Sequence, residues 1–257
     1  MMLGNGKRDA ASAGSRAVQV AFLVGLLLLW YVATNYWGVS HLLLPEPVQV
    51  FWQFVDIIKT GEYIDDLKVT LGELATAFAV SCTTGVTLGY LISRSQYLIR
   101  VFEPLFAGIY AIPIILFLPL YVLMFGLGPM SKVALGTTIS FFPIVLSTIA
   151  GFGYVERTYI VSARSMGASE YQLFRYVLLP AALPVILTGM RMGFTVALLS
   201  IIGSETIASL AGLGHRIVHL AEGMDMARMF AYIAFVVAIA AILNTVVSSL
   251  EAGGRRR

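Results

Sequence analysis

The chain has 257 residues, of which 58% are hydrophobic and only 12% are charged, and its net charge is +3. Soluble domains carry about 25% charged residues, so this composition excludes an ordinary water-soluble fold. The basic residues lie between the hydrophobic runs rather than on one face of a domain, which argues against nucleic-acid binding. The single cysteine, Cys82, excludes a disulfide framework or a cysteine metal site within one chain.

Several hydrophobic runs reach the roughly 20 residues that a helix needs to cross a bilayer. We therefore expect an all-α polytopic membrane protein with about six transmembrane helices, at about 18–36, 69–92, 104–125, 132–152, 182–208 and 229–249. The first run is too long for the core of a secretory signal and ends in bulky residues, so it is expected to be retained. The hydrophilic segment between the first two runs, 38–67, predicts a short amphipathic helix.

The distribution of Lys and Arg predicts the orientation of these helices. More of these residues fall on the side that carries both termini, which indicates that both termini are cytoplasmic. The expected organisation is a cytoplasmic tail, one transmembrane domain and a basic cytoplasmic tail, at residues 1–17, 18–250 and 251–257.

The longest predicted cytoplasmic connection, 153–180, is amphipathic, and loops of this length are usually functional. Gly167 divides it and favours a bend, and Ser169 is expected to cap the second helix with Glu170 in its first turn. Pro180 and Pro184 are expected to end that helix and redirect the chain. The apolar residues at helical spacing are Tyr159, Ile160, Ala163 and Met166, then Tyr171, Phe174 and Leu178, with Leu173 and Val177 beside them.

Two interpretations of this connection stay open on the residues alone. It is either an amphipathic hairpin that lies flat on the membrane or a rigid elbow that docks a cytoplasmic partner.

A glycine followed thirteen residues later by a proline, Gly167 and Pro180, resembles the EAA loop of ABC importer permeases. Ala163 matches the last alanine of the family's Glu-Ala-Ala start, whereas Val161 and Ser162 stand at its glutamate and first alanine positions. Segments from "LLLPEPVQV" to "SETIASLAGLGHRI" follow the permeases for nitrate, taurine and alkanesulfonates in order and spacing, over roughly residues 42–250.

The resemblance implies a type I ABC importer permease in a bacterial inner membrane. Its partners would be two ABC ATPase subunits that bind ATP and Mg²⁺, a second permease copy in a homodimer, and a periplasmic or lipid-anchored solute-binding protein. This chain would carry no cofactor and no catalytic activity, since it lacks the Walker-A pattern G-x-x-x-x-G-K-[ST]. The solute would be a small oxyanion such as a sulfonate, taurine or nitrate, with bicarbonate, a pyrimidine vitamin precursor or an aromatic acid as alternatives.

The resemblance also implies a coupling helix at about 167–176, between the fourth and fifth spans. The expected ATPase-coupling residues are Ala163, Arg164, Gly167, Ala168, Ser169, Glu170, Gln172, Phe174, Arg175 and Pro180. The candidates for the translocation pathway or its gate are Tyr110, Pro113, Phe142, Pro143, Met192, Ser200 and Glu205.

Glu205 lies near the outer end of the fifth span. A charged side chain at the centre of a span costs about 2.5–3.5 kcal/mol. Glu205 is either an interfacial acid paired with Arg216 or Arg228 or, as the resemblance implies, a residue near the external gate. An acid would not attract an anionic solute, so direct substrate binding is not assigned to it.

Other polar residues have simpler interpretations. Arg191 is expected to reach the interface or to pair with Glu156 or Glu170, and Glu73 and Glu103 are expected to be interfacial. His215 and His219 lack the further ligands of a metal site and are expected to line the outer vestibule.

Prolines and paired glycines mark the span interiors. Pro113, Pro119 and Pro143 are expected to interrupt the third and fourth spans. The pairs Gly85 with Gly89 and Gly189 with Gly193 are expected to allow close helix contact.

Two rival classes fit less well. An intramembrane enzyme would need a catalytic pattern such as H-E-x-x-H or G-x-S-x-G, and neither is present. A scaffold subunit would leave the amphipathic connection and its prolines unexplained.

Overall fold

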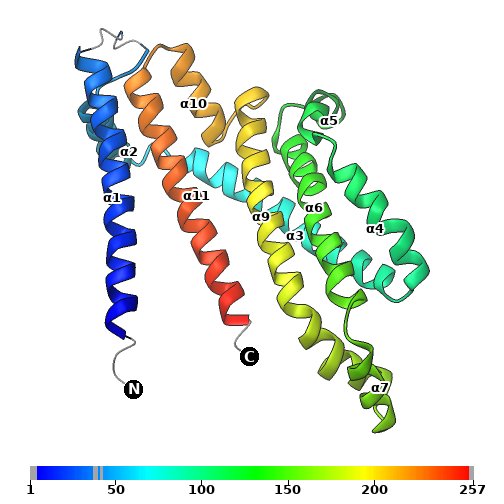
Figure 1. Cartoon of the computed structure of the whole chain (residues 1–257). Coiled ribbons are helices and arrows are strands. Elements are labelled where there is room, and N and C mark those ends of the chain that lie inside the picture. The colour runs from blue at the N-terminus through cyan, green and yellow to red at the C-terminus, as the bar shows by residue number, and fades with distance from the viewer. Residues whose placement is uncertain (1–4, 37–39, 41–42, 255–257) are drawn as a thin grey trace. The chain divides into compact units, whose positions relative to one another are not determined.

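The computed structural model describes residues 5–36, 40 and 43–254, and every regular element among them is helical. The elements in chain order (Figure 1) are α1 (Asn5–Tyr36), α2 (Pro47–Thr60), α3 (Ile64–Ser93), α4 (Gln96–Tyr110), η1 (Ile114–Phe117), α5 (Leu118–Phe125), α6 (Pro129–Gly153), α7 (Arg157–Ser165), α8 (Glu170–Leu173), η2 (Phe174–Leu178), α9 (Leu179–Ile207), α10 (Leu213–Glu222) and α11 (Met226–Gly254).

The chain forms two compact units, residues 1–62 with 219–235 and residues 63–218 with 236–257. In the first unit, the Arg228 guanidinium binds the carboxylates of Glu62 at 2.7 Å and Asp56 at 3.4 Å. The Tyr232 hydroxyl donates to Glu62 at 3.0 Å. These contacts tie the start of α11 to α2, the helix predicted within 38–67.

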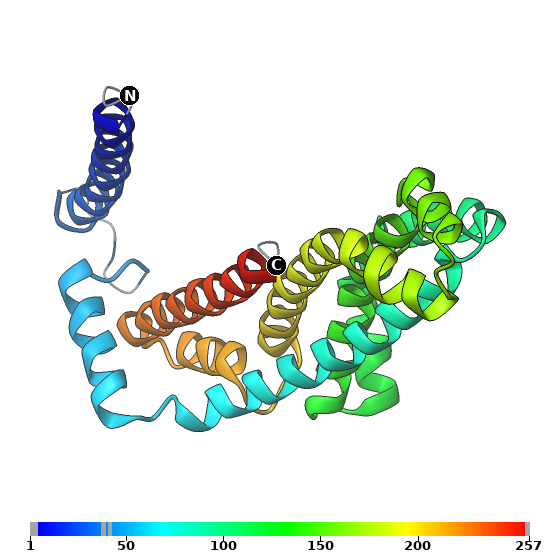
Figure 2. The ribbon, with the colours of Figure 1, turned by 90° about the horizontal axis from the view of Figure 1, so that it is seen from below.

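The second unit is built on α6, which packs against both α3 and α9, while α3 runs obliquely across the other two (Figures 1 and 2). The paired glycines make this possible: a Cβ on Gly89 of α3 would lie 2.6 Å from the Thr148 Cβ of α6. A Cβ on Gly193 of α9 would lie 2.7 Å from the Ile144 side chain. The predicted close contact is confirmed, and it lies within one chain.

Four helices among the described residues are long and apolar enough to cross a membrane, and they match the predicted second, fourth, fifth and sixth spans. The predicted first span lies within α1, where the apolar stretch Val24–Tyr36 is shorter than those four. The predicted all-α architecture is confirmed.

The predicted third span, 104–125, is a broken helix rather than a continuous one. It starts earlier, at Gln96, and the helix axis bends by 71° between α4 and the segment η1–α5. Pro113 stands at the break, as predicted, because a proline offers no backbone N–H to continue the α4 ladder.

The prediction that Pro180 and Pro184 end a helix is wrong. The helix continues from α8 through the π-helical turn η2 into α9, where Pro180 lies in the first turn and Pro184 in the interior. A π-turn shifts the hydrogen-bonding register, which accommodates a residue without an N–H and explains why the chain is not redirected here.

Candidate functional site

The elbow consists of α7, the bend at Gly167 and α8. Gly167 has φ +80°, a left-handed conformation that glycine adopts without a steric penalty. Its N–H donates to the Arg164 carbonyl at 3.0 Å, and the Ala168 N–H donates to the Ala163 carbonyl at 3.1 Å. This is the Schellman pattern, which closes the end of α7 and fixes the bend predicted at Gly167.

The second half of the elbow starts with a capping box. The Ser169 hydroxyl accepts from the Gln172 N–H at 3.3 Å, and the Gln172 side chain accepts from the Ser169 N–H at 2.8 Å. Across the bend, Arg164 binds Glu170 at 2.9 Å. The predicted cap is confirmed, and α8 begins at Glu170 rather than at Gly167 because Gly167 and Ala168 close α7.

The apolar stripe predicted along the elbow is only partly buried. Ala163 and Leu173 pack inward, whereas Met166 and Tyr171 are 82% and 72% exposed. Tyr176, which follows in η2 and was not part of the predicted stripe, is 73% exposed. Large apolar side chains held on a rigid, capped bend form a surface suited to binding another protein.

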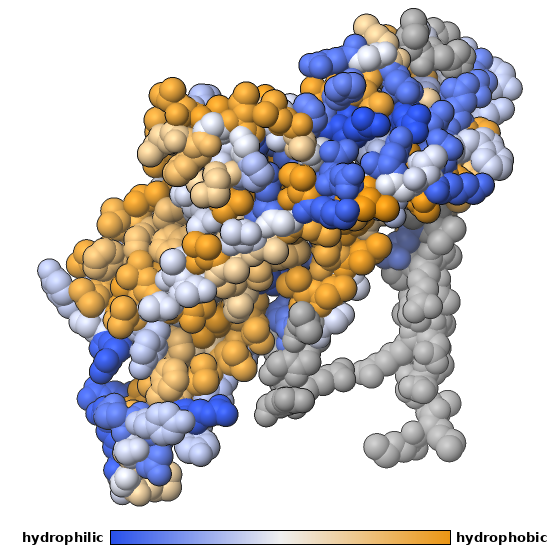
Figure 3. Space-filling model, turned by 180° about the vertical axis from the view of Figure 1, so that it is seen from behind, coloured by the Kyte–Doolittle hydropathy of each residue, from blue (hydrophilic) through white to orange (hydrophobic). Residues whose placement is uncertain are grey.

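A groove of about 500 Å³ continues this surface between α7 and the start of α9. Its lining residues are Tyr159, Ser162, Ala163, Met166, Tyr176, Val177, Pro180 and Ala181. In Figure 3 the elbow, at the lower left, is mostly hydrophilic, whereas the bundle above it is largely hydrophobic.

The predicted coupling residues fall into two sets. The exposed residues are Arg164, Gly167, Ser169, Glu170, Gln172, Arg175 and Pro180, and the remainder, Ala163, Ala168 and Phe174, are at least partly buried.

Phe174 connects the elbow to the bundle. Its ring lies 5.1 Å from the ring of Tyr90 on α3 and 6.1 Å from that of Phe152 on α6, and those two rings are 5.0 Å apart. Because Phe174 belongs to the π-turn that leads into α9, a displacement of the elbow acts on α3, α6 and α9 together.

The pairing predicted for Arg191 is wrong. Arg191 binds Glu251 near the end of α11 at 3.3 Å, and the Thr188 hydroxyl donates to the same carboxylate at 3.0 Å. Glu170 binds Arg164 instead. Helix packing brings together α9 and α11 residues that lie about 60 positions apart in the sequence.

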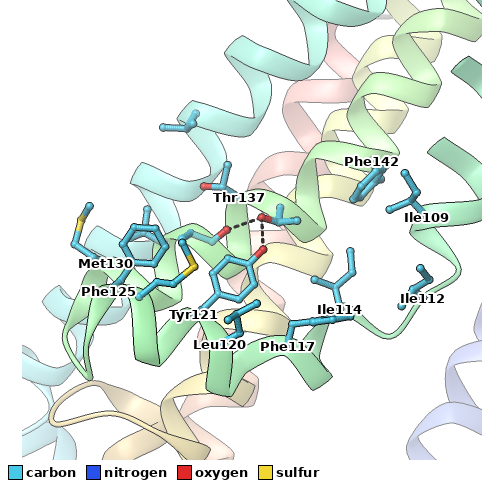
Figure 4. Close-up of a pocket in the computed structure, with 15 residues that line it drawn as sticks. Ile109, Ile112, Ile114, Phe117, Leu120, Tyr121, Phe125, Met130, Thr137 and Phe142 are labelled. Carbon is cyan, nitrogen blue, oxygen red and sulfur yellow. Dashed lines mark hydrogen bonds between the residues drawn. The ribbon is translucent and has the colours of Figure 1, made fainter. Parts of the chain in front are cut away.

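A pocket of about 750 Å³ lies beside the broken span (Figure 4). It is lined by Val80, Ile109, Ile112, Ile114, Phe117, Leu120, Tyr121, Met124, Phe125, Met130, Val133, Ala134, Thr137, Thr138 and Phe142. Its lining residues include no charged side chain, and the Tyr121 hydroxyl donates to Thr138 at 2.8 Å.

The predicted pathway residues are divided between this pocket and α9. Phe142 lines the pocket and its ring lies 6.1 Å from that of Tyr110, while Pro113 lies between two lining residues at the helix break. Pro143 is buried inside α6, which continues through it, so the prediction that it interrupts the fourth span is wrong. The other three, Met192, Ser200 and Glu205, follow along α9 and do not line the pocket.

Glu205 is buried rather than interfacial, with only 1% of its surface exposed. Its carboxylate accepts hydrogen bonds from the Thr70 hydroxyl and from the Gly214 N–H, both at 2.7 Å. The Thr70 hydroxyl also accepts from the Leu213 N–H at 3.0 Å. Glu205 therefore fastens the end of α9 to α3 and to the first turn of α10.

Two neighbours of Glu205 were not among the predicted site residues. Glu73, expected at the interface, is buried, and Lys132 of α6 is fully buried. Glu103, by contrast, is half-buried and accepts from the Tyr154 hydroxyl at 2.9 Å. The signal for the first two was their charge inside an apolar span, which marks a functional or structural site.

Comparison with known proteins gives concordant results. The family described as binding-protein-dependent transport system inner membrane component matches residues 83–253. The taurine transport system permease protein TauC of Escherichia coli (strain K12) is 30% identical over 91% of this chain and 87% of its own length. The formylaminopyrimidine transport permease protein ThiX of Halalkalibacterium halodurans is 30% identical over 87% of this chain and 88% of its own.

The fold matches solved ABC transporters. An inward-facing structure of the MetNI methionine ABC transporter aligns with a TM-score of 0.64 at 17% identity, over 79% of this chain and 97% of that chain. An amino acid ABC transporter crystallised with histidines aligns with a TM-score of 0.62 at 22% identity, over 79% of this chain and 98% of that chain.

Proposed function

Because the chain belongs to the family of binding-protein-dependent transport system inner membrane components and is thus a permease subunit of an ABC importer, we propose that it forms the pathway for a small oxyanion. The solute is a sulfonate, taurine or nitrate, delivered by a periplasmic or lipid-anchored binding protein. The chain acts as a non-catalytic subunit in the bacterial inner membrane, with the elbow and both termini in the cytoplasm.

The docking of an ATPase, which the importer requires, is supported by the exposed apolar surface of the elbow. Met166 and Tyr171 project from a bend that is fixed by the Schellman pattern and the capping box, and Tyr176 is exposed just beyond it in η2. We assign this surface to one of two ABC ATPase subunits, which hold ATP and Mg²⁺, since this chain has no Walker-A motif. A second copy of the chain completes the pathway.

The continuity of the helix explains how such docking would act on the pathway. ATPase closure biases the membrane helices only through contacts that differ between the two states. The helix runs unbroken from α8 through η2 into α9. From Leu179 to Glu205 it extends about 39 Å, at a rise of about 1.5 Å per residue. A rigid-body displacement of the elbow is therefore transmitted along α9 to the opposite end of the bundle.

The relatives support the choice of solute without deciding it. The taurine relative and the aliphatic sulfonate permease protein SsuC of Bacillus subtilis, 27% identical, support an oxyanion. The formylaminopyrimidine relative and the riboflavin permease protein RibX of Chloroflexus aurantiacus, each 30% identical, support a heterocyclic solute as the alternative. The described residues that line the pocket beside the broken span include no charged side chain, so we place specificity mainly in the binding protein.

The experiment is ATP-driven uptake by proteoliposomes that contain the permease, its ATPase and its binding protein. Labelled taurine is the substrate, and an alkanesulfonate or riboflavin is the competitor. The proposal predicts uptake that depends on ATP and on the binding protein and that the alkanesulfonate suppresses. Uptake suppressed by riboflavin alone would reject the oxyanion, and uptake that needs no ATPase would reject the importer.

A further inference from the structure

A carboxyl group is buried without a hydrogen-bond donor at the end of the bundle opposite the elbow. Glu73 of α3 is 3% exposed, and within the described part of the chain neither of its carboxyl oxygens has a hydrogen-bond partner. An ionised carboxylate in this position would have lost its hydration without any compensating bond. Some further group must therefore satisfy Glu73.

The group that can satisfy it is the carboxyl group of Glu205, which is close enough to Glu73 for the two to interact electrostatically. Glu205 already accepts from Thr70 and from the Gly214 N–H, so it is the member of the pair with donors around it. Two ionised carboxylates cannot form a hydrogen bond with one another, because neither has a hydrogen to donate. A proton on Glu73 converts the contact into an O–H···O bond to Glu205.

The charges around the pair favour the same arrangement. Lys132 of α6 is fully buried, and its positive charge interacts electrostatically with both carboxyl groups. Its ammonium group also donates to the carbonyls of Leu127 and Gly128 at the start of α6. The negative charge of Asp66 on α3 repels that of Glu205. Asp66 is partly exposed, however, and it accepts a hydrogen bond from the Gly212 N–H. Lys132 is the one buried lysine among the described residues, and its charge balances one buried carboxylate.

We propose that Glu73 and Glu205 form a proton-binding site that holds one proton between their carboxyl groups, with Lys132 as the counter-charge of the remaining carboxylate. The site joins α3, α6 and α9 to the first turn of α10, and it does not depend on which solute the protein carries. The proton completes the hydrogen bonding of Glu73 and keeps a second negative charge out of the bundle.

Infrared spectroscopy of the full-length protein at neutral pH tests this site, with a detergent that contains no carbonyl group. The wild type is expected to show the carbonyl stretch of a protonated carboxylic acid, shifted after exchange into D2O. Glu73→Gln is expected to abolish this band. Glu103→Gln, which replaces a half-buried acid in the same unit, is expected to retain it. A wild type without the band, or a band that persists in Glu73→Gln, would overturn the proposal.

The melting temperature of the same variants gives an independent reading. Glutamine has the shape of a protonated glutamate, and its amide can donate to Glu205, so Glu73→Gln is expected to melt at the wild-type temperature. If Glu73→Gln melts at a lower temperature than Glu103→Gln, the negative charge of Glu73 is required for stability and the proposal is wrong.

Discussion

The contact between α3 and α6 leaves no room for a methyl group at Gly89. A Cβ at this position would lie 2.6 Å from the Thr148 Cβ and 3.0 Å from the Val145 carbonyl oxygen. Ordinary carbon–carbon contacts are about 3.5–4.0 Å, so the helices would have to separate by about 1 Å. The Thr148 Cβ cannot rotate away because it is attached directly to the backbone.

Gly89→Ala is therefore expected to destabilise the protein. Overpacking of this kind costs about 1–3 kcal/mol, and the higher helix propensity of alanine returns about 1 kcal/mol. We expect a net loss of about 1 kcal/mol in the free energy of unfolding. Gly72→Ala, in the same helix but with nothing within 4 Å of the added Cβ, is the matched control. It is expected to gain up to about 1 kcal/mol.

Unfolding in mixed micelles of a mild detergent and SDS measures this difference. The thiol of Cys82, the single cysteine of the chain, reports unfolding through its reaction with a fluorophore. Gly89→Ala should unfold at a lower fraction of SDS than Gly72→Ala, by about 2 kcal/mol when both are compared. Equal stability of the two variants would show that α3 and α6 do not pack as closely as the structure places them.

Three further predictions concern single polar contacts. Thr70→Val removes the hydroxyl that donates to the buried carboxylate of Glu205 and should cost about 1–3 kcal/mol in the same assay. Thr83→Val removes only a hydrogen bond from an exposed side chain to the backbone of its own helix and should cost clearly less. Ser169→Ala removes the cap of α8 at about 1 kcal/mol and should weaken ATPase co-purification, with unchanged binding as the contrary result. Arg191→Met should cost about 1–3 kcal/mol, because it removes the cation from a Glu251 carboxylate that is only 9% exposed, and an unchanged stability would contradict that view.

The sequence predicted the elements that depend on local composition. Helices α3, α6, α9 and α11 follow the hydropathy of the chain, because a membrane requires apolar runs of a fixed length. The bend at Gly167 and the cap at Ser169 were predictable for the same reason, since each depends on a few consecutive residues.

Features that depend on packing between distant segments were not predictable in this way. Glu73 was expected at the interface and Lys132 was not singled out, but the packing of α3, α6 and α9 buries both. Arg191 found its partner about 60 residues away, on a helix whose register no local pattern encodes. Pro180 was expected to end a helix because a proline usually does, but the π-turn before it accommodates the missing N–H and the helix continues.

The central claim, that the elbow docks the ATPase, is tested most directly by co-purification of the ATPase with an affinity-tagged permease. The variant carries Met166→Ser and Tyr171→Ser, and Leu123→Ser on α5 is the control, since this residue is equally apolar and 83% exposed. The elbow variant is expected to reach the membrane at the wild-type level and to lose the ATPase, while the control retains it. An elbow variant that retains the ATPase as fully as the control would contradict the claim.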